Sequence, residues 1–157
     1  SRTEQGYCGR SMNTVAMPAG DGRGGFVPTP FRTPGYAHLM STTPTKSLDT
    51  FPNPHPDRDY VITFDAAEFT CLCPLTGQPD FAHFVIDYIP DELCVELKSL
   101  KLYLWSYRDE GAFHEAVTNQ ILNDVVAAVG PRWAKIVGDW NVRGGIRTIV
   151  TAEHSNS

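Results

Sequence analysis

Residues 60–90 read YVITFDAAEFTCLCPLTGQPDFAHFVIDYIP, and this stretch decides the fold. Tyr60–Thr70 is rich in β-branched and aromatic residues, which favour a strand. Asp80–Tyr88 alternates well enough to predict a second strand, which Pro90 ends. The segment between them, Cys71–Pro79, is rich in turn residues. The stretch therefore predicts two neighbouring strands whose connecting turn carries two cysteines.

Two helices are expected after these strands. The apolar residues of Ala112–Val129 have helical spacing, and Gly130-Pro131 ends that helix. Glu96–Arg108 has mixed periodicity and is ambiguous by itself. Ser99 would cap a helix in this segment. We interpret it as the first of the two helices.

The last part of the chain predicts a second pair of strands, Trp133–Asp139 and Ile146–Ala152, joined through the hairpin Asn141–Gly145. The order ββααββ predicts an α+β domain with an antiparallel sheet and both helices on one face. Edge strands of such a sheet are exposed and need protection or partners. Several copies that pair edge to edge in a ring would meet this need, so we expect an oligomer.

The chain changes character near residue 58. Its 157 residues suit one domain with a tail. Residues 1–58 hold 8 of the 12 prolines and 7 of the 13 glycines and show no helical or strand period. We interpret residues 1–58 as an extended arm, partly disordered alone, and residues 59–157 as the folded domain. Met40 is a plausible natural first residue, so we interpret residues 1–39 as an upstream extension.

Charge and cysteine content exclude several classes of protein. The net charge is −5, and residues 59–157 carry fourteen acidic against seven basic residues, which argues against a general nucleic-acid-binding surface. No apolar run approaches the roughly 18 residues of a membrane span, and the N-terminus lacks the apolar core of a secretory signal. Four cysteines in a chain of this length predict free thiols. We expect a cytoplasmic protein that binds neither nucleic acid nor membranes.

The turn after the first strand carries residues suited to covalent catalysis. Cys73 leaves the strand, and Asp80 follows seven residues later. A cysteine attacks as the thiolate, and an aspartate can deliver a proton to the atom that becomes basic. Two buried cysteines in a β-turn explain the same pattern without chemistry. Zinc bound by Cys71, Cys73 and His114 is a third interpretation, disfavoured because alternate strand residues point to opposite faces.

Three other stretches carry polar residues suited to an anion or a purine. Lys98 and Lys101 are three residues apart, on one helical face that could hold a phosphate. His114 and Glu115 combine a proton donor with a carboxylate able to accept two hydrogen bonds from a guanine-like edge. The hairpin Arg143–Gly145 offers another phosphate ligand. The alternatives are a solvated helix face for the two lysines, a polar helix start for His114 and Glu115, and an exposed turn for the hairpin.

Taken together, these stretches resemble the NADPH-dependent 7-cyano-7-deazaguanine reductases of queuosine biosynthesis, in their short, single-module form. The resemblance covers roughly residues 45–152. Phe69–Phe81 resembles the family's nucleophile loop. Glu96–Tyr103 fits the Glu-x-Lys-Ser-x-Lys run, ending in an aromatic residue, that separates these reductases from their relatives. Phe113–Glu115 and Arg143–Gly145 fall at matching intervals.

The resemblance implies a tunnelling fold, whose ββααββ units form a ring with a central barrel of sheets and helices outside. It also implies a homodecamer of two pentamers with active sites between subunits. The implied reaction reduces the nitrile of 7-cyano-7-deazaguanine to a primary amine. It consumes two NADPH, proceeds through a covalent cysteine thioimide and requires no metal.

The resemblance also implies a role for each candidate residue. Cys73 is the nucleophile, Asp80 the general acid and base, and His114 assists proton transfer or positions the imine. Glu115 anchors the deazaguanine edge, helped by backbone groups near the start of the first helix. The implied substrate-binding set is Glu115, Glu96, Leu97, Lys98 and Ser99. The implied set for the NADPH phosphates is Lys98, Lys101, Arg143 and Gly144.

Three alternatives belong to other functional classes. A relative that adds ammonia to the same nitrile on tRNA lacks the lysine-bearing run that this chain has at Glu96–Tyr103. A zinc-dependent, pterin-forming cyclohydrolase of similar fold would be separated by metal analysis. A non-catalytic purine-binding ring would leave Cys73, Asp80 and His114 idle.

Overall fold

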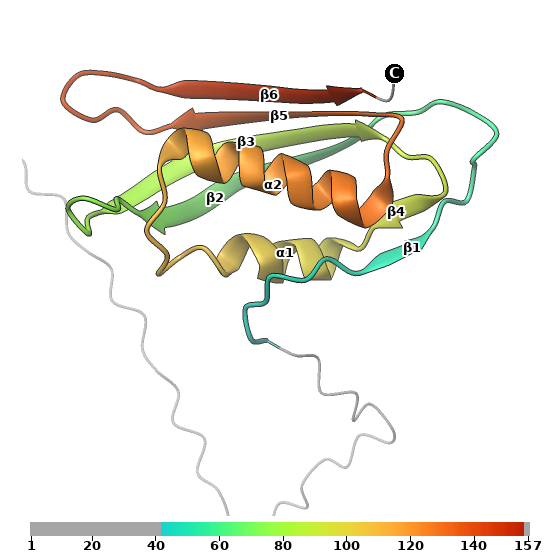
Figure 1. The fold of residues 1–157 in the computed structure, drawn as a ribbon, viewed down its shortest axis with the longest axis horizontal. Helices are drawn as coiled ribbons and strands as arrows, with labels where there is room; N and C mark the ends of the chain where they lie inside the picture. Colours follow the sequence, from blue (N-terminus) through green and yellow to red (C-terminus); the bar gives the residue numbers. More distant parts are fainter. Residues whose placement is uncertain (1–41, 156–157) are drawn as a thin grey trace, which may run out of the picture. The chain divides into compact units, whose positions relative to one another are not determined.

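The structure is a computed structural model, and it describes residues 42–155. Its elements, in chain order, are β1 (Thr50–Pro52), β2 (Ile62–Leu72), β3 (Pro79–Ile89), β4 (Leu93–Val95), α1 (Leu97–Trp105), α2 (His114–Val129), β5 (Trp133–Trp140) and β6 (Ile149–Ser155). Four strands form an antiparallel sheet in the order β2-β3-β5-β6, and both helices lie on one face of it (Figure 1). The predicted α+β class, the antiparallel sheet and the two helices are confirmed.

The core lies between the sheet and the helices. In β3 and β5 every second residue is buried, because alternate strand residues point to opposite faces. The buried side chains from these two strands are Asp80, Ala82, Phe84, Ile86, Tyr88, Ala134, Ile136 and Trp140. Helix α2 covers them with Val117, Ile121 and Val125, which repeat every four residues and so share one helical face.

A β-bulge in β2 sets which side chains of that strand enter the core. Ala66 pairs with Phe84 and Phe69 pairs with Ala82, so two residues of β2 stand opposite one residue of β3. The extra residue reverses the alternation, and Phe69 and Cys71 beyond the bulge are buried. Without it, Cys71 would point to the opposite face of the sheet.

Helix α1 begins differently from the prediction. The cap is Glu96, whose carboxylate accepts hydrogen bonds from the backbone N–H groups of Lys98 and Ser99, at 2.9 and 2.7 Å. Ser99, predicted as the cap, lies inside the first turn instead. Its buried hydroxyl accepts a 2.9 Å hydrogen bond from the backbone N–H of Asp49. The ambiguous segment is therefore helical, and its first turn is tied to the chain before β2.

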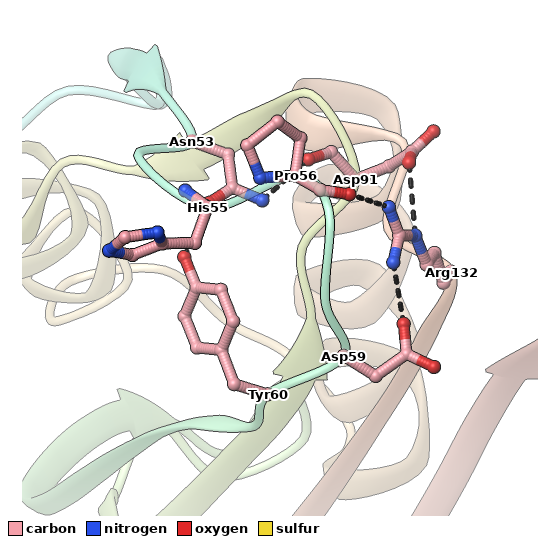
Figure 2. Close-up of polar contacts among 7 residues, drawn as sticks. All are labelled: Asn53, His55, Pro56, Asp59, Tyr60, Asp91 and Arg132. Carbon is pink, nitrogen blue, oxygen red and sulfur yellow. Dashed lines mark hydrogen bonds and ion pairs between the residues drawn. The ribbon is translucent and has the colours of Figure 1, made fainter.

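Part of the predicted arm is described and packs on the domain. Strand β1 pairs with β4, with Thr50 opposite Val95. The side chain of Asn53 is buried, donates to the backbone carbonyl of Asp91 at 2.6 Å and accepts from the hydroxyl of Tyr60 (Figure 2). Residues 1–41 of that arm, including the predicted upstream extension, lie outside the described residues. The boundary at residue 58 stays a prediction.

Arg132, just before β5, fastens the loop that leads into β2 (Figure 2). Its guanidinium donates to the carbonyl of Pro56 at 2.6 Å and forms ion pairs with Asp59 and Asp91, at 2.5 and 3.0 Å. Three contacts from one rigid, planar group hold the loop against the connection between β3 and β4. Within the described range, neither helix is long and apolar enough to cross a membrane.

Candidate active site

Four of the predicted site residues meet at one end of the sheet. There β2 turns into β3, α2 begins, and β5 leads into the β5–β6 hairpin (Figure 1). Cys73 lies in the first of these connections, Asp80 in the first residues of β3, His114 at the start of α2 and Arg143 in the hairpin. Strand pairing, rather than sequence proximity, brings these residues together.

The turn after β2 is shaped to stabilise a thiolate at Cys73. The backbone N–H of Cys73 donates to the carbonyl of Gln78, and the N–H of Gly77 donates to the carbonyl of Cys73, both at 2.8 Å. Gly77 has a φ of 68°, a left-handed conformation that glycine adopts without strain. Hydrogen bonds from the hydroxyl of Thr76 and from the backbone of Leu75 and Thr76 lower the pKa of the Cys73 thiol to about 7. Such a thiol is substantially ionised at neutral pH.

Cys71, only two residues earlier, is in the opposite environment. It is fully buried and pairs across the sheet with Asp80. Burial, followed by the negative charge of Asp80, raises the pKa of the Cys71 thiol to about 11. A protonated, inaccessible thiol is a packing group rather than a nucleophile.

Asp80 contacts two other polar side chains at this end. Its side chain is 4% exposed, and its two oxygens have different partners. Oδ1 lies 2.7 Å from Nη1 of Arg143, and Oδ2 lies 3.5 Å from Nε2 of His114. A second guanidinium nitrogen of Arg143 donates to the side-chain oxygen of Gln78 at 3.0 Å. A buried carboxylate needs such charge compensation, because its desolvation is costly.

His114 is held by an aromatic contact as well as by Asp80. Its imidazole lies flat on the indole of Trp140, with ring centroids 3.9 Å apart and planes 7° apart. Glu115 follows it in the first turn of α2, where its exposed carboxylate is favoured by the helix dipole. His114 and Glu115 are thus adjacent at the helix start, as the sequence predicts.

The sequence patterns do not single out Thr76, Gln78 and Trp140 as site residues. Thr76 and Gln78 lie inside the turn already singled out for Cys73, so their position in that turn was an available signal. The predicted strand ends one residue before Trp140, whereas β5 in the structure includes it. Its contact with the start of α2 depends on tertiary packing, which no local pattern reports.

The predicted residues of helix α1 lie away from this cluster. Helix α1 starts beside β4, at the other end of the domain from the turn that carries Cys73 (Figure 1). Backbone hydrogen bonds from Lys98 and Ser99 lower the pKa of Glu96. Leu97, Lys98 and Lys101 are exposed. Gly144 lies in the β5–β6 hairpin beside Arg143, with a φ of 57°.

A groove of about 1030 Å³ runs between α1 and β2. Lys101 and Arg108 line it with positive charge, Asp65 and Glu68 line it with negative charge, and Leu97, Leu104 and Trp105 supply apolar surface. Cys73, Asp80 and His114 do not line this groove. Among residues 42–155, no three His, Cys, Asp or Glu side chains cluster as a metal site requires, so the set proposed for zinc is not formed.

Comparison with known proteins identifies the family. A family model described as "QueF-like protein" matches residues 79–157. The NADPH-dependent 7-cyano-7-deazaguanine reductase of Anaeromyxobacter sp. (strain Fw109-5) is 64% identical over 115 residues, covering 73% of this chain and 94% of the relative. The chain belongs to this reductase family. The family member from Halorhodospira halophila is 65% identical over 115 residues, with coverage of 73% and 98%. The predicted resemblance is confirmed.

Solved structures give the same fold. The apo crystal structure of the archaeosine synthase QueF-Like superposes with a TM-score of 0.58 at 24% sequence identity. The match covers 62% of this chain and 95% of the other. At this identity the likeness concerns the fold alone. The family therefore rests on the reductases that are 64 and 65% identical, not on this structural likeness.

Proposed function

We propose that this chain reduces the nitrile of 7-cyano-7-deazaguanine to the primary amine, with NADPH as the reductant. The observation that carries the proposal is the Cys73 thiol, whose pKa is lowered to about 7, at the same end of the domain as the buried Asp80–His114 pair. Membership of a family whose relatives bear the name of this reaction supports the substrate.

Cys73 supplies the nucleophile. Its thiolate adds to the nitrile carbon, the carbon–nitrogen triple bond becomes a double bond, and the nitrogen takes up a proton. The product is a covalent thioimide, which accepts hydride more readily than the nitrile and so divides one hard step into easier ones. The hydrogen bonds from Thr76 and Leu75 keep the thiol ionised for the first step.

Asp80 and His114 supply the protons. Their contact of 3.5 Å joins two groups that can exchange a proton, as general acid–base catalysis requires. One proton goes to the nitrogen when the thioimide forms. Another follows when hydride reaches the carbon, and the resulting thiohemiaminal then expels the Cys73 thiolate to leave a protonated imine. A second hydride gives the amine.

NADPH, when bound, provides the two hydrides. The residues that would hold its phosphates are Lys98 and Lys101, exposed on α1, and Arg108, which lines the same groove of about 1030 Å³ as Lys101. Asp65 and Glu68 line that groove too, so its formal charge is balanced without the contribution of Lys98. Arg143 fits less simply, because Asp80 and Gln78 already engage it. The Arg143 side chain is 38% exposed. The outer edge of its guanidinium would therefore be open to a phosphate, which would also contact Gly144.

On this proposal, residues from more than one copy of the chain form the complete site. Glu115 stands beside His114 and would anchor the deazaguanine edge, whereas the backbone of residues 96–99 begins α1 at the other end of the domain. Residues 96–99 of a neighbouring subunit would then close the pocket and exclude water from the imine. Exposed edges on β2 and β6 suit a ring, and a homodecamer of two pentamers is the assembly proposed.

The test is loss of NADPH absorbance by the purified protein with and without 7-cyano-7-deazaguanine. The expected result is nitrile-dependent oxidation of two NADPH for each nitrile consumed. Folded, oligomeric protein that forms a thioimide but oxidises no NADPH would contradict the proposal and favour the ammonia-adding alternative. Protein that binds the nitrile without forming a thioimide would favour the non-catalytic purine-binding ring.

A further inference from the structure

Trp140 is the largest of the fully buried side chains in the described chain, and it contacts a residue of the site. Its indole lies 3.9 Å from the imidazole of His114, nearly parallel to it. Nε2 of the same imidazole lies 3.5 Å from Oδ2 of Asp80. The imidazole is therefore held on one face by an aromatic ring and on one edge by a carboxylate.

The indole is itself fixed in place. Phe69 and Phe84 meet it edge to face, with ring centroids 5.9 and 5.7 Å away. Gly138 makes room for this arrangement, because a Cβ at that position would lie 2.7 Å from the ring of Phe84. The backbone N–H of Trp140 donates to the carbonyl of Thr148 at 2.9 Å. The surface against which His114 rests is therefore part of the packed core.

The indole nitrogen shows that packing alone does not explain a tryptophan here. Nε1 of Trp140 is buried and has no hydrogen-bond partner among the described residues. A buried donor without an acceptor destabilises a fold, and a phenylalanine would fill the core without that penalty. What the indole adds is a larger aromatic face, the side-chain surface that best accommodates a cation.

We propose that Trp140 is a positioning residue for the reaction. Its indole holds the imidazole of His114 so that Nε2 stays directed at Asp80, and its face supports the imidazolium that forms during proton transfer. The proposal rests on the proton-transfer role proposed above for His114. It adds that the orientation of His114 comes from the end of β5, a strand distant from the helix that carries the histidine.

The first experiment reads the contact without turnover. A protonated imidazole in van der Waals contact with indole quenches its fluorescence, so tryptophan emission should fall as pH falls through the range in which histidine titrates. The effect should disappear in His114→Asn and in Trp140→Phe, while Trp105→Phe, which alters a 41% exposed tryptophan, should retain it. Emission that does not change with pH, or that changes equally in His114→Asn, would overturn the proposal.

Other ionisable groups near the imidazole come from each element at this end. They are Asp80 on β3, Cys71 on β2, Cys73 in the following turn, Arg143 in the β5–β6 hairpin and Glu115 on α2 itself. Emission that titrates in His114→Asn would point to one of these groups. The comparison with His114→Asn therefore assigns the signal to the stacked ring.

The second experiment measures catalysis. Trp140→Leu should lower kcat by about ten-fold or more, with a much smaller change in the KM for the nitrile, because misplacing a catalytic group affects the reacting state most. The pH dependence of kcat should also shift, and Trp140→Phe, which keeps an aromatic ring but offers a smaller face, should recover only part of the rate. A Trp140→Leu protein that is folded and keeps kcat within about two-fold would contradict the proposal.

If Trp140→Leu does not fold, the fluorescence titration and its comparison with His114→Asn still decide. Should the unaltered protein show no nitrile-dependent NADPH oxidation, the proposed function fails. The fluorescence titration would then test the stacked contact separately.

Discussion

At the end of the domain that carries Cys73, polar side chains bond to one another: Arg143 pairs with Asp80, and His114 contacts the same carboxylate. At the start of α1, the carboxylate of Glu96 bonds only to its own helix backbone among the contacts described, and Lys98 and Lys101 are exposed. The first arrangement is pre-organised for chemistry on a small group, since reacting atoms must be held closely. The second suits an anion arriving from outside, for which flexible ammonium groups suffice. On the proposed function, the first end would perform the chemistry and the second would add a surface for an anion.

The largest expected effect concerns the two thiols at the first end. Cys73→Ala should abolish nitrile-dependent NADPH oxidation, because no other described thiol there is both accessible and ionised. Cys71→Ala should retain activity and lose some stability, since it removes a buried side chain. Steady-state rates, with the oligomer checked by size-exclusion chromatography, measure both. Activity that survives in Cys73→Ala and vanishes in Cys71→Ala would reverse the assignment of the nucleophile.

Arg143 and Lys101 provide a direct comparison of the two ends. Lys101→Ala should raise the KM for NADPH with little change in kcat, as expected for loss of uniform binding. Arg143→Ala should raise the KM for NADPH more than that for the nitrile and also lower kcat, because Arg143 holds Asp80 at 2.7 Å. Initial rates over a grid of both substrates give these constants. Equal changes in both KM values for Arg143→Ala would remove its phosphate role.

The pH dependence of Cys73 alkylation tests the turn itself. Only the thiolate reacts with iodoacetamide, so the rate should rise with pH and reach half its maximum near the thiol pKa of about 7. Thr76→Val removes the hydrogen bond that lowers this pKa most, so its midpoint should move upward. Mass spectrometry of the labelled peptide separates Cys73 from Cys71. A midpoint unchanged in Thr76→Val would show that the backbone donors and Arg143 lower this pKa without the hydroxyl.

The smallest expected effect is on stability at the other end. Glu96→Ala removes the cap of α1 and should cost about 1 kcal/mol of unfolding free energy at pH 7. The folded state lowers the pKa of Glu96 below 4.5, so its stabilisation is complete above that value and is lost as pH falls through the lowered pKa. Denaturant unfolding at pH 7 and at low pH measures the difference. A difference that persists fully at low pH would show that the cap does not act through its charge.

Much of the fold could be predicted from the sequence because strand and helix periodicities are local. Both strand pairs, the helix at residues 114–129 and its end at Gly130 follow from patterns within a dozen residues. The cap of α1 was predicted wrongly as Ser99. Ser99 has the residue type of a cap, but the hydrogen bonds of the first turn go to Glu96, three residues earlier.

The candidate site was less predictable, because its contacts cross the sheet. Cys73 and Asp80 are close in sequence, and their turn could be interpreted from its own residues. The partners of Asp80 come from the start of α2 and from the hairpin after β5, and they meet only when the strands pair. The stack of His114 on Trp140 likewise joins a helix to a strand 26 residues away.

The amino-acid sequence by itself determined the α+β class, the turn that carries Cys73 and the family to which the chain belongs, because each of these depends on residues close together in the chain. The tertiary structure alone decided that Cys71 is buried while Cys73 is not, since a bulge in β2 turns Cys71 into the core and the strand ends at Leu72, before Cys73. It also decided the neighbours of Asp80 and His114. Contacts between distant segments depend on strand register and packing, and a local pattern carries no record of either.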